Sequence, residues 1–135
     1  MGVVVFDSDV LIAFLSSHDA HHQAAVERVG ASLAPGTRRL LCAVNYAEIL
    51  IGPIRAGVDA RVKTMLAQFG IETVAVDVAL AERAATVRAR TNLKLPDAFA
   101  LATVVDAERR GAEGVRLESF DEKVIKAHAA LRPAA

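Results

Sequence analysis

The stretch Val3-Val4-Val5-Phe6-Asp7-Ser8-Asp9-Val10-Leu11-Ile12-Ala13-Phe14-Leu15 decides how the rest of the chain is interpreted. Four apolar residues that favour β-strands run directly into acidic residues, and apolar residues at helical spacing follow. This pattern predicts a buried strand that ends at Asp7, where a helix begins. Open α/β sheets bind their ligands at this kind of junction, beyond the carboxyl ends of the strands.

The composition predicts one domain, over residues 1–135, with an ample apolar core, because 53% of its residues are hydrophobic. Sixteen basic and sixteen acidic residues cancel, so any positive potential that attracts nucleic acid must be local. The opening apolar run is too short for a signal peptide or a membrane span, and we expect no membrane association. Cys42 is the only cysteine and lies in an apolar run, which favours a core position and a reducing, cytoplasmic compartment.

Further along the chain, short apolar runs alternate with segments of helical periodicity. This alternation predicts an α/β fold in which a parallel sheet of four strands, with room for a fifth, carries about seven helices on its two faces. We expect the helix after the second strand to end or kink at Gly52-Pro53, and Asp59 and Asp77 to cap later helices. The three later strands are predicted at 39–43, 71–76 and 114–118, and the helices at 8–15, 23–35, 44–51, 60–69, 78–90, 95–111 and 121–131.

Three histidines, His18, His21 and His22, lie close together before the second helix. No cysteine or glutamate stands at zinc-ligand spacing beside them. We therefore interpret them as a solvated helix start.

Four acidic residues are predicted to meet at one edge of the sheet. Asp7 follows the first strand, Glu48 lies in the second turn of a helix, Asp97 in the first turn of another, and Asp121 follows the fourth strand. Two unit charges about 4 Å apart repel by roughly 4 kcal/mol at an effective dielectric constant of 20. Either the pKa values rise or a cation lies among the carboxylates, and the cation that such oxygen ligands suit is Mg²⁺ or Mn²⁺. A site of this kind hydrolyses phosphodiester or related phosphoryl groups.

Each acid also has a structural interpretation. Asp7, Asp9 and Asp97 could cap helices or complement the dipole of a first helical turn. Asp121 lies in Ser119-Phe120-Asp121-Glu122, which matches a capping box. Glu48 is different, because a carboxylate among apolar neighbours in a packed helix needs a functional reason.

Four motifs together resemble the PIN-domain nucleases over essentially the full length, and most of all the VapC ribonuclease toxins of toxin–antitoxin pairs. They are Phe6-Asp7-Ser8-Asp9-Val10-Leu11-Ile12, Val44-Asn45-Tyr46-Ala47-Glu48-Ile49-Leu50, Leu95-Pro96-Asp97-Ala98-Phe99-Ala100-Leu101-Ala102 and Ser119-Phe120-Asp121. The order and spacing of the motifs are more specific than any one of them. The chain departs from the family pattern in two places, where Asp9 replaces a residue that is often uncharged and Ser119 replaces the commoner Thr.

The resemblance implies a PIN-like three-layer fold and an endoribonuclease whose Asp7, Glu48, Asp97 and Asp121 hold Mg²⁺ or Mn²⁺. Ser119 would support the fourth acid, and Asp9 would be either an extra ligand or a helix cap. The resemblance also implies a homodimer that a small VapB-type antitoxin silences.

Two other functions stay open at this point. Asp7-Ser8-Asp9 after a strand also resembles the start of the haloacid-dehalogenase phosphatases, although the Gly-Thr that usually follows is absent. Such a phosphatase would form an aspartyl-phosphate at Asp7, whereas a nuclease would activate water. The third possibility is a PIN-like module that binds a partner without catalysis.

Overall fold

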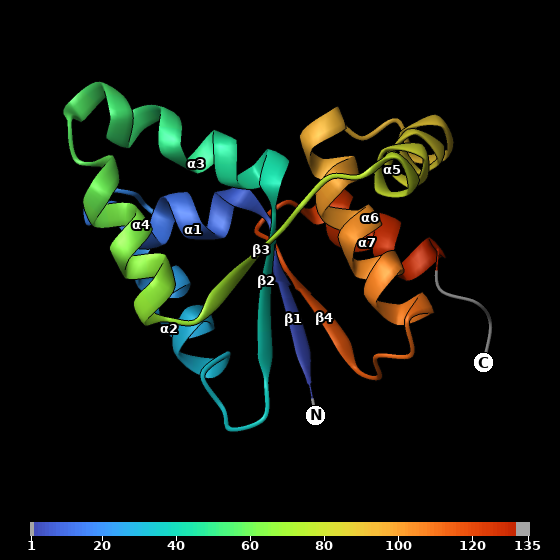
Figure 1. Ribbon diagram of the computed structural model, residues 1–135, viewed down its shortest axis with the longest axis horizontal. Coiled ribbons are helices and arrows are strands. Elements are labelled where there is room, and N and C mark those ends of the chain that lie inside the picture. The colour runs from blue at the N-terminus through green and yellow to red at the C-terminus, as the bar shows by residue number, and fades with distance from the viewer. Residues whose placement is uncertain (1, 132–135) are drawn as a thin grey trace.

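Four parallel strands form the centre of the computed structural model, which describes residues 2–131 (Figure 1). No fifth strand occurs within those residues. The strands are β1 (Val3–Phe6), β2 (Arg38–Cys42), β3 (Ile71–Val74) and β4 (Val115–Glu118). The helices are α1 (Ser8–Leu15), α2 (His22–Ala31), α3 (Ala43–Ala56), α4 (Asp59–Gln68), α5 (Val78–Thr91), α6 (Leu95–Arg109) and α7 (Glu122–Leu131). The predicted three-layer α/β architecture is confirmed.

Helices cover both faces of the sheet, with α1 to α4 on one side and α5 to α7 on the other (Figure 1). Side chains of a strand alternate between the faces, so β1 contributes to two separate cores. Val4 and Phe6 pack in the cluster of α1 to α4. Val3 and Val5 pack in the cluster of α5 to α7. Burial on both faces explains why the first strand reads as an unbroken apolar run.

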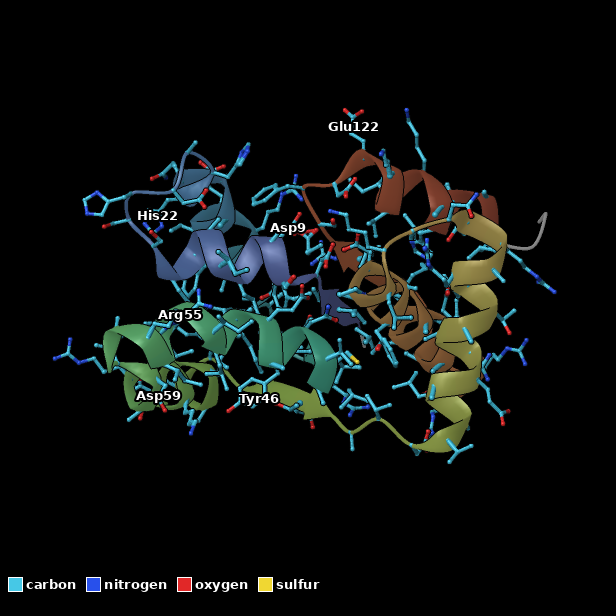
Figure 2. All side chains as sticks on the ribbon, turned by 90° about the horizontal axis from the view of Figure 1, so that it is seen from above. Asp9, His22, Tyr46, Arg55, Asp59 and Glu122 are labelled. Atoms are coloured by element: carbon cyan, nitrogen blue, oxygen red, sulfur yellow. The ribbon has the colours of Figure 1, made fainter. Side chains whose placement is uncertain are left out.

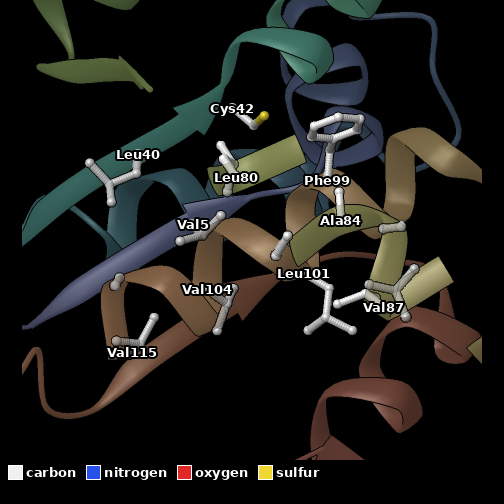
Figure 3. Packing of buried hydrophobic residues seen from close by; sticks show 14 of the residues in the cluster. Val5, Leu40, Cys42, Leu80, Ala84, Val87, Phe99, Leu101, Val104 and Val115 are labelled. Carbon is white, nitrogen blue, oxygen red and sulfur yellow. The ribbon is translucent and has the colours of Figure 1, made fainter. Parts of the chain in front are cut away.

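Helix α6 is the most deeply buried helix of the second layer. Leu101 and Val104 lie in the same cluster as Val5 of β1 and Val115 of β4 (Figure 3). Pro96 stands in its first turn, where the missing N–H of proline costs no helical hydrogen bond. The carbonyl of Pro96 accepts a hydrogen bond from the Asn45 amide, which ties the first turn of α6 to α3.

In the strand order β3-β2-β1-β4, the direction in which successive strands are added to the sheet reverses at β1. The chain moves outward from β1 to β2 and β3, and then crosses to the other side of β1 to form β4. All strand pairs are parallel. In such sheets the crevice beyond the carboxyl ends at the reversal point is the usual place for a ligand. Here that crevice lies between the ends of β1 and β4.

Several element boundaries differ from those predicted. Helix α3 passes through Pro53 and continues to Ala56, because proline removes one backbone hydrogen bond and still accommodates helical φ. The residue before α4 is Val58, so Asp59 is not its cap and instead pairs with Lys63, with 3.6 Å between Oδ2 and Nζ. Asp77 does cap α5, accepting a hydrogen bond from the N–H of Leu80 at 2.8 Å.

Helix α3 ends at Gly57, which has φ of +73°. A side chain is strained in this left-handed conformation, so Gly57→Ala should lower the free energy of unfolding by about 1 kcal/mol. Gly30 is the matched control, because it lies inside α2 and a Cβ there would meet nothing within 4 Å. Gly30→Ala should raise stability by about 0.5–1 kcal/mol. Urea unfolding of both variants checks this, and equal shifts would contradict the assignment.

Candidate active site

The acidic site begins at Asp7, which forms the N-cap of α1 directly after β1. Its carboxylate accepts hydrogen bonds from the N–H of Ser8 and from the hydroxyl of Ser119, both at 2.9 Å. Only 1% of Asp7 is exposed. Burial, together with the charges of Asp9 and Asp97, raises the pKa of Asp7 to about 7, although its hydrogen bonds with Ser119 and Ser8 oppose the rise. A buried carboxylate with this pKa is unusual for a simple helix cap.

Asp9 lies one residue into α1 and faces the same crevice, in which Figure 2 labels it between α1 and the start of α7. Its Oδ2 accepts a hydrogen bond from the N–H of Phe120 at 3.0 Å, and the Ser119 hydroxyl lies 3.5 Å away. The other oxygen, Oδ1, is buried and has no hydrogen-bond partner. Burial raises the pKa of Asp9, and the charge of Asp121 adds to this effect. The orphaned oxygen is a candidate ligand atom.

Ser119 and Asp121 reach the site from the segment between β4 and α7. The Ser119 hydroxyl, which donates to Asp7, accepts a hydrogen bond from the N–H of Asp121 at 3.0 Å. Asp121 itself accepts from the N–H of Lys123 at 2.9 Å, near the start of α7. The predicted capping box is therefore wrong in detail, because Ser119 faces the acids while Asp121 holds the first turn of α7.

Asp97 lies in the first turn of α6, half-buried. Burial raises its pKa, and the charges of Asp121, Glu48 and Asp9 raise it further. Lys94 partly opposes this rise. Asp97 therefore interacts with acids from three other elements, α1, α3 and the segment before α7. Asp97 is thus close enough to feel the charge of acids that lie far apart in the sequence.

Glu48 extends from α3 and is oriented by Asn45, a residue to which we assigned no role. Asn45 is fully buried, and its amide donates to Glu48 Oε1 and to the carbonyl of Pro96, both at 3.1 Å. Asn45 therefore joins the turn of α3 that carries Glu48 to the start of α6 that carries Asp97. The sequence signal that could have identified Asn45 is its polar amide between Val44 and Tyr46 in a helix expected to pack on the sheet.

The donor set fits a hard divalent cation in chemistry and in charge. All the donors are carboxylates, they raise one another's pKa values, and one oxygen of Asp9 is buried without a partner. Across residues 2–131, no three acidic, histidine or cysteine side chains already stand where they could hold a metal ion. The carboxylates would have to turn inward, a movement that their repulsion opposes until a cation neutralises it.

A cavity of about 580 Å³ lies elsewhere, between the sheet and the last turns of α6. Val3, Leu40, Ala107 and Arg110 are among its lining residues, and none of the acids of the site is. The candidate site is therefore marked by its convergent charges and not by this cavity.

Two of the three clustered histidines, His21 and His22, contact other elements, and the cysteine lies in the core. His22 bonds through Nδ1 to the carbonyl of Ala13 at 2.8 Å and so joins α2 to α1. The exposed His21 stacks on Phe120, so it is more than the solvated residue we expected. Cys42 is fully buried in the core, as predicted.

Comparison with known proteins agrees with this geometry. The PIN-domain family matches residues 4–130, nearly the whole chain. The chain belongs to the PIN-domain family. This assignment leaves the resemblance to haloacid-dehalogenase phosphatases without support, since one PIN domain accounts for all four motifs. No curated protein sequence matches the chain significantly.

Solved structures share this PIN fold at low sequence identity. A toxin–antitoxin complex from Klebsiella pneumoniae has a TM-score of 0.69 and 23% identity, over 93% of this chain and 90% of that one. VapC20 of Mycobacterium tuberculosis, a sarcin–ricin loop cleaving toxin, has a TM-score of 0.66 and 18% identity, over 97% and 95%. VapBC2 of Rickettsia felis, bound to a DNA fragment from its promoter, has a TM-score of 0.56 and 13% identity, over 90% and 100%.

Proposed function

We propose that this PIN domain is a divalent-metal-dependent endoribonuclease that acts as the toxin of a VapBC-type pair. The observation that carries the proposal is the convergence of Asp7, Asp97 and their acidic neighbours at the switch point of the sheet. Family membership and the likeness to toxin structures support it.

Asp7, Glu48, Asp97 and Asp121 would hold Mg²⁺ or Mn²⁺, with Asp9 as a further oxygen donor. When bound, such an ion neutralises charge that develops on the phosphate and makes water a stronger nucleophile near neutral pH. The Ser119 hydroxyl fixes the carboxylate of Asp7 by donating to Oδ2, and the Asn45 amide fixes that of Glu48. These contacts restrain Asp7 and Glu48, so that fewer acidic side chains have to move when a cation binds.

The direct test is digestion of a mixed cellular RNA pool by the purified protein. Cleavage at defined positions in the presence of Mn²⁺ or Mg²⁺, and its loss on addition of a chelator, are expected. Mapping the cut ends identifies the substrate at the same time. Metal binding without cleavage of any RNA would instead favour a non-catalytic PIN module.

The partners that we propose are a second copy of the chain and a small VapB-type antitoxin. Two of the similar structures described above are a toxin–antitoxin complex and a VapBC structure. Large apolar side chains that a partner could cover are exposed on α1, α3, α5 and α6, namely Ile12, Ile51, Ile54, Val78 and Leu95. Light scattering tests dimerisation of the isolated chain, and inhibition of cleavage by a co-expressed partner tests the antitoxin.

Among residues 2–131, no helix combines the length and the apolar character that crossing a bilayer requires. We propose the cytoplasm as the place of action, where cellular RNA is available as substrate.

A further inference from the structure

The segment Ser119–Asp121 supplies one wall of the acidic site through three consecutive residues. The Ser119 hydroxyl donates to Asp7, the N–H of Phe120 donates to Asp9, and Asp121 raises the pKa of Asp97. The segment connects β4 to α7 and belongs to neither element. Something must therefore fix it at the correct distance from α1.

Helix α2 provides that fixation through contacts with the opposite side of the segment. The Arg28 guanidinium donates through Nη1 to the carbonyl of Ser119 at 2.7 Å. The guanidinium carbon of Arg28 also lies 4.5 Å from the centroid of the Phe120 ring, a cation–π distance. The His21 ring stacks on Phe120 with centroids 5.0 Å apart and an interplanar angle of 26°.

Both groups that contact the Phe120 ring come from the α2 region of the chain. His21 is the N-cap of α2, and Arg28 lies within the helix, seven positions further along. We call His21, Arg28 and Phe120 the α2 clamp. The clamp brings residues near the start of the chain onto a segment near its end.

We propose that Arg28 is a positioning residue for the acidic site, acting through the α2 clamp. The expected effect on metal binding rests on the proposed function. The position of the segment rests on the contacts of the clamp. Arg28 is half-buried and its hydrogen bond is charge-assisted, so the contact is strong. Without it, the α2 side of the segment keeps the stacking of His21 on Phe120 but loses its hydrogen bond, and the acids on the other side repel one another.

The decisive variants change the clamp and leave the acids untouched. Arg28→Met keeps the length of the side chain and removes its hydrogen bond and its charge. Arg28→Lys keeps the charge and one donor, and should restore part of the effect. Arg116→Met is the matched control, because Arg116 is an exposed arginine on β4, the strand that leads into the same segment.

Amide hydrogen exchange, measured by NMR without metal, reports on the clamp directly. In Arg28→Met, the amides of Phe120 and Asp121 should exchange at least about tenfold faster, as expected for loss of a hydrogen bond to a charged group. Amides of the β1 core, such as those of Val4 and Val5, should not change. Equal exchange in Arg28→Met and Arg116→Met, or acceleration throughout the chain, would overturn the proposal.

Manganese affinity, measured by the electron paramagnetic resonance of free Mn²⁺, reports on the consequence. Arg28→Met should weaken Mn²⁺ binding by about 10-fold or more, as substitutions of residues that orient metal ligands do. Arg116→Met should leave the affinity unchanged. Faster exchange with unchanged affinity would reduce the clamp to a structural tie and overturn the positioning role. Failure of the wild-type chain to bind Mn²⁺ would count against the proposed function, and the exchange data would then decide the clamp alone.

Discussion

Asp7→Asn and Asp97→Asn are each expected to reduce metal-dependent RNA cleavage by at least about 100-fold, the range seen when one preorganised electrostatic group is removed from an active site. Both substitutions keep the shape of the side chain and remove its charge. Asp7 can keep its hydrogen bond from the N–H of Ser8, because an amide oxygen also accepts. The measurement is the rate of cleavage of a mapped RNA site under single-turnover conditions with excess Mn²⁺.

The matched control for these variants is Asp59→Asn. Asp59 lies at the start of α4, far from Asp9 in Figure 2, and pairs with the Lys63 ammonium. Cleavage by Asp59→Asn should equal that of the wild type. Full activity in Asp7→Asn and Asp97→Asn would remove these acids from the reaction. Unfolding of both variants would instead support the interpretation of the acids as helix caps.

The second large effect is the pH dependence of stability in a chelator. Asp7 has an ordinary pKa of 3.8 and a pKa of about 7 in the folded chain. The folded state therefore binds more protons than the unfolded state between these values, and its stability falls as the pH rises from about 4 to about 7. A shift of this size corresponds to on the order of 4 kcal/mol. The raised pKa values of Asp9 and Asp97 act in the same direction.

Urea unfolding at several pH values, with the wild type and Asp7→Asn in parallel, isolates the contribution of Asp7. The variant should lose less stability than the wild type across this range and should be the more stable of the two at pH 8. Mn²⁺ should restore stability to the wild type at high pH, by about 2.7 kcal/mol at 100 times the dissociation constant. The same pH slope in both proteins would contradict the burial of a charged Asp7.

The sequence predicts the strands well, because each strand is a local pattern of apolar residues. The buried run of β1 leads directly into Asp7, the N-cap of α1. The end of α3 was predicted less well. Local rules predict an end or a kink at Gly52-Pro53, and the helix continues to Ala56, before the left-handed Gly57.

The supporting contacts could not be predicted, because they join residues that share no local pattern. Arg28 appears in the sequence as one more polar residue of an amphipathic helix. Its role depends on the carbonyl of Ser119, 91 positions away. Asn45 depends in the same way on Pro96, 51 positions away. A period of 3.6 residues shows which side of a helix is apolar and cannot show which loop a polar side chain will reach.

The bond between Ser119 and Asp7 spans 112 positions. Strand β1 is synthesised long before its neighbour β4, so Asp7 gains its hydrogen bond from Ser119 only after the segment beyond β4 has been made.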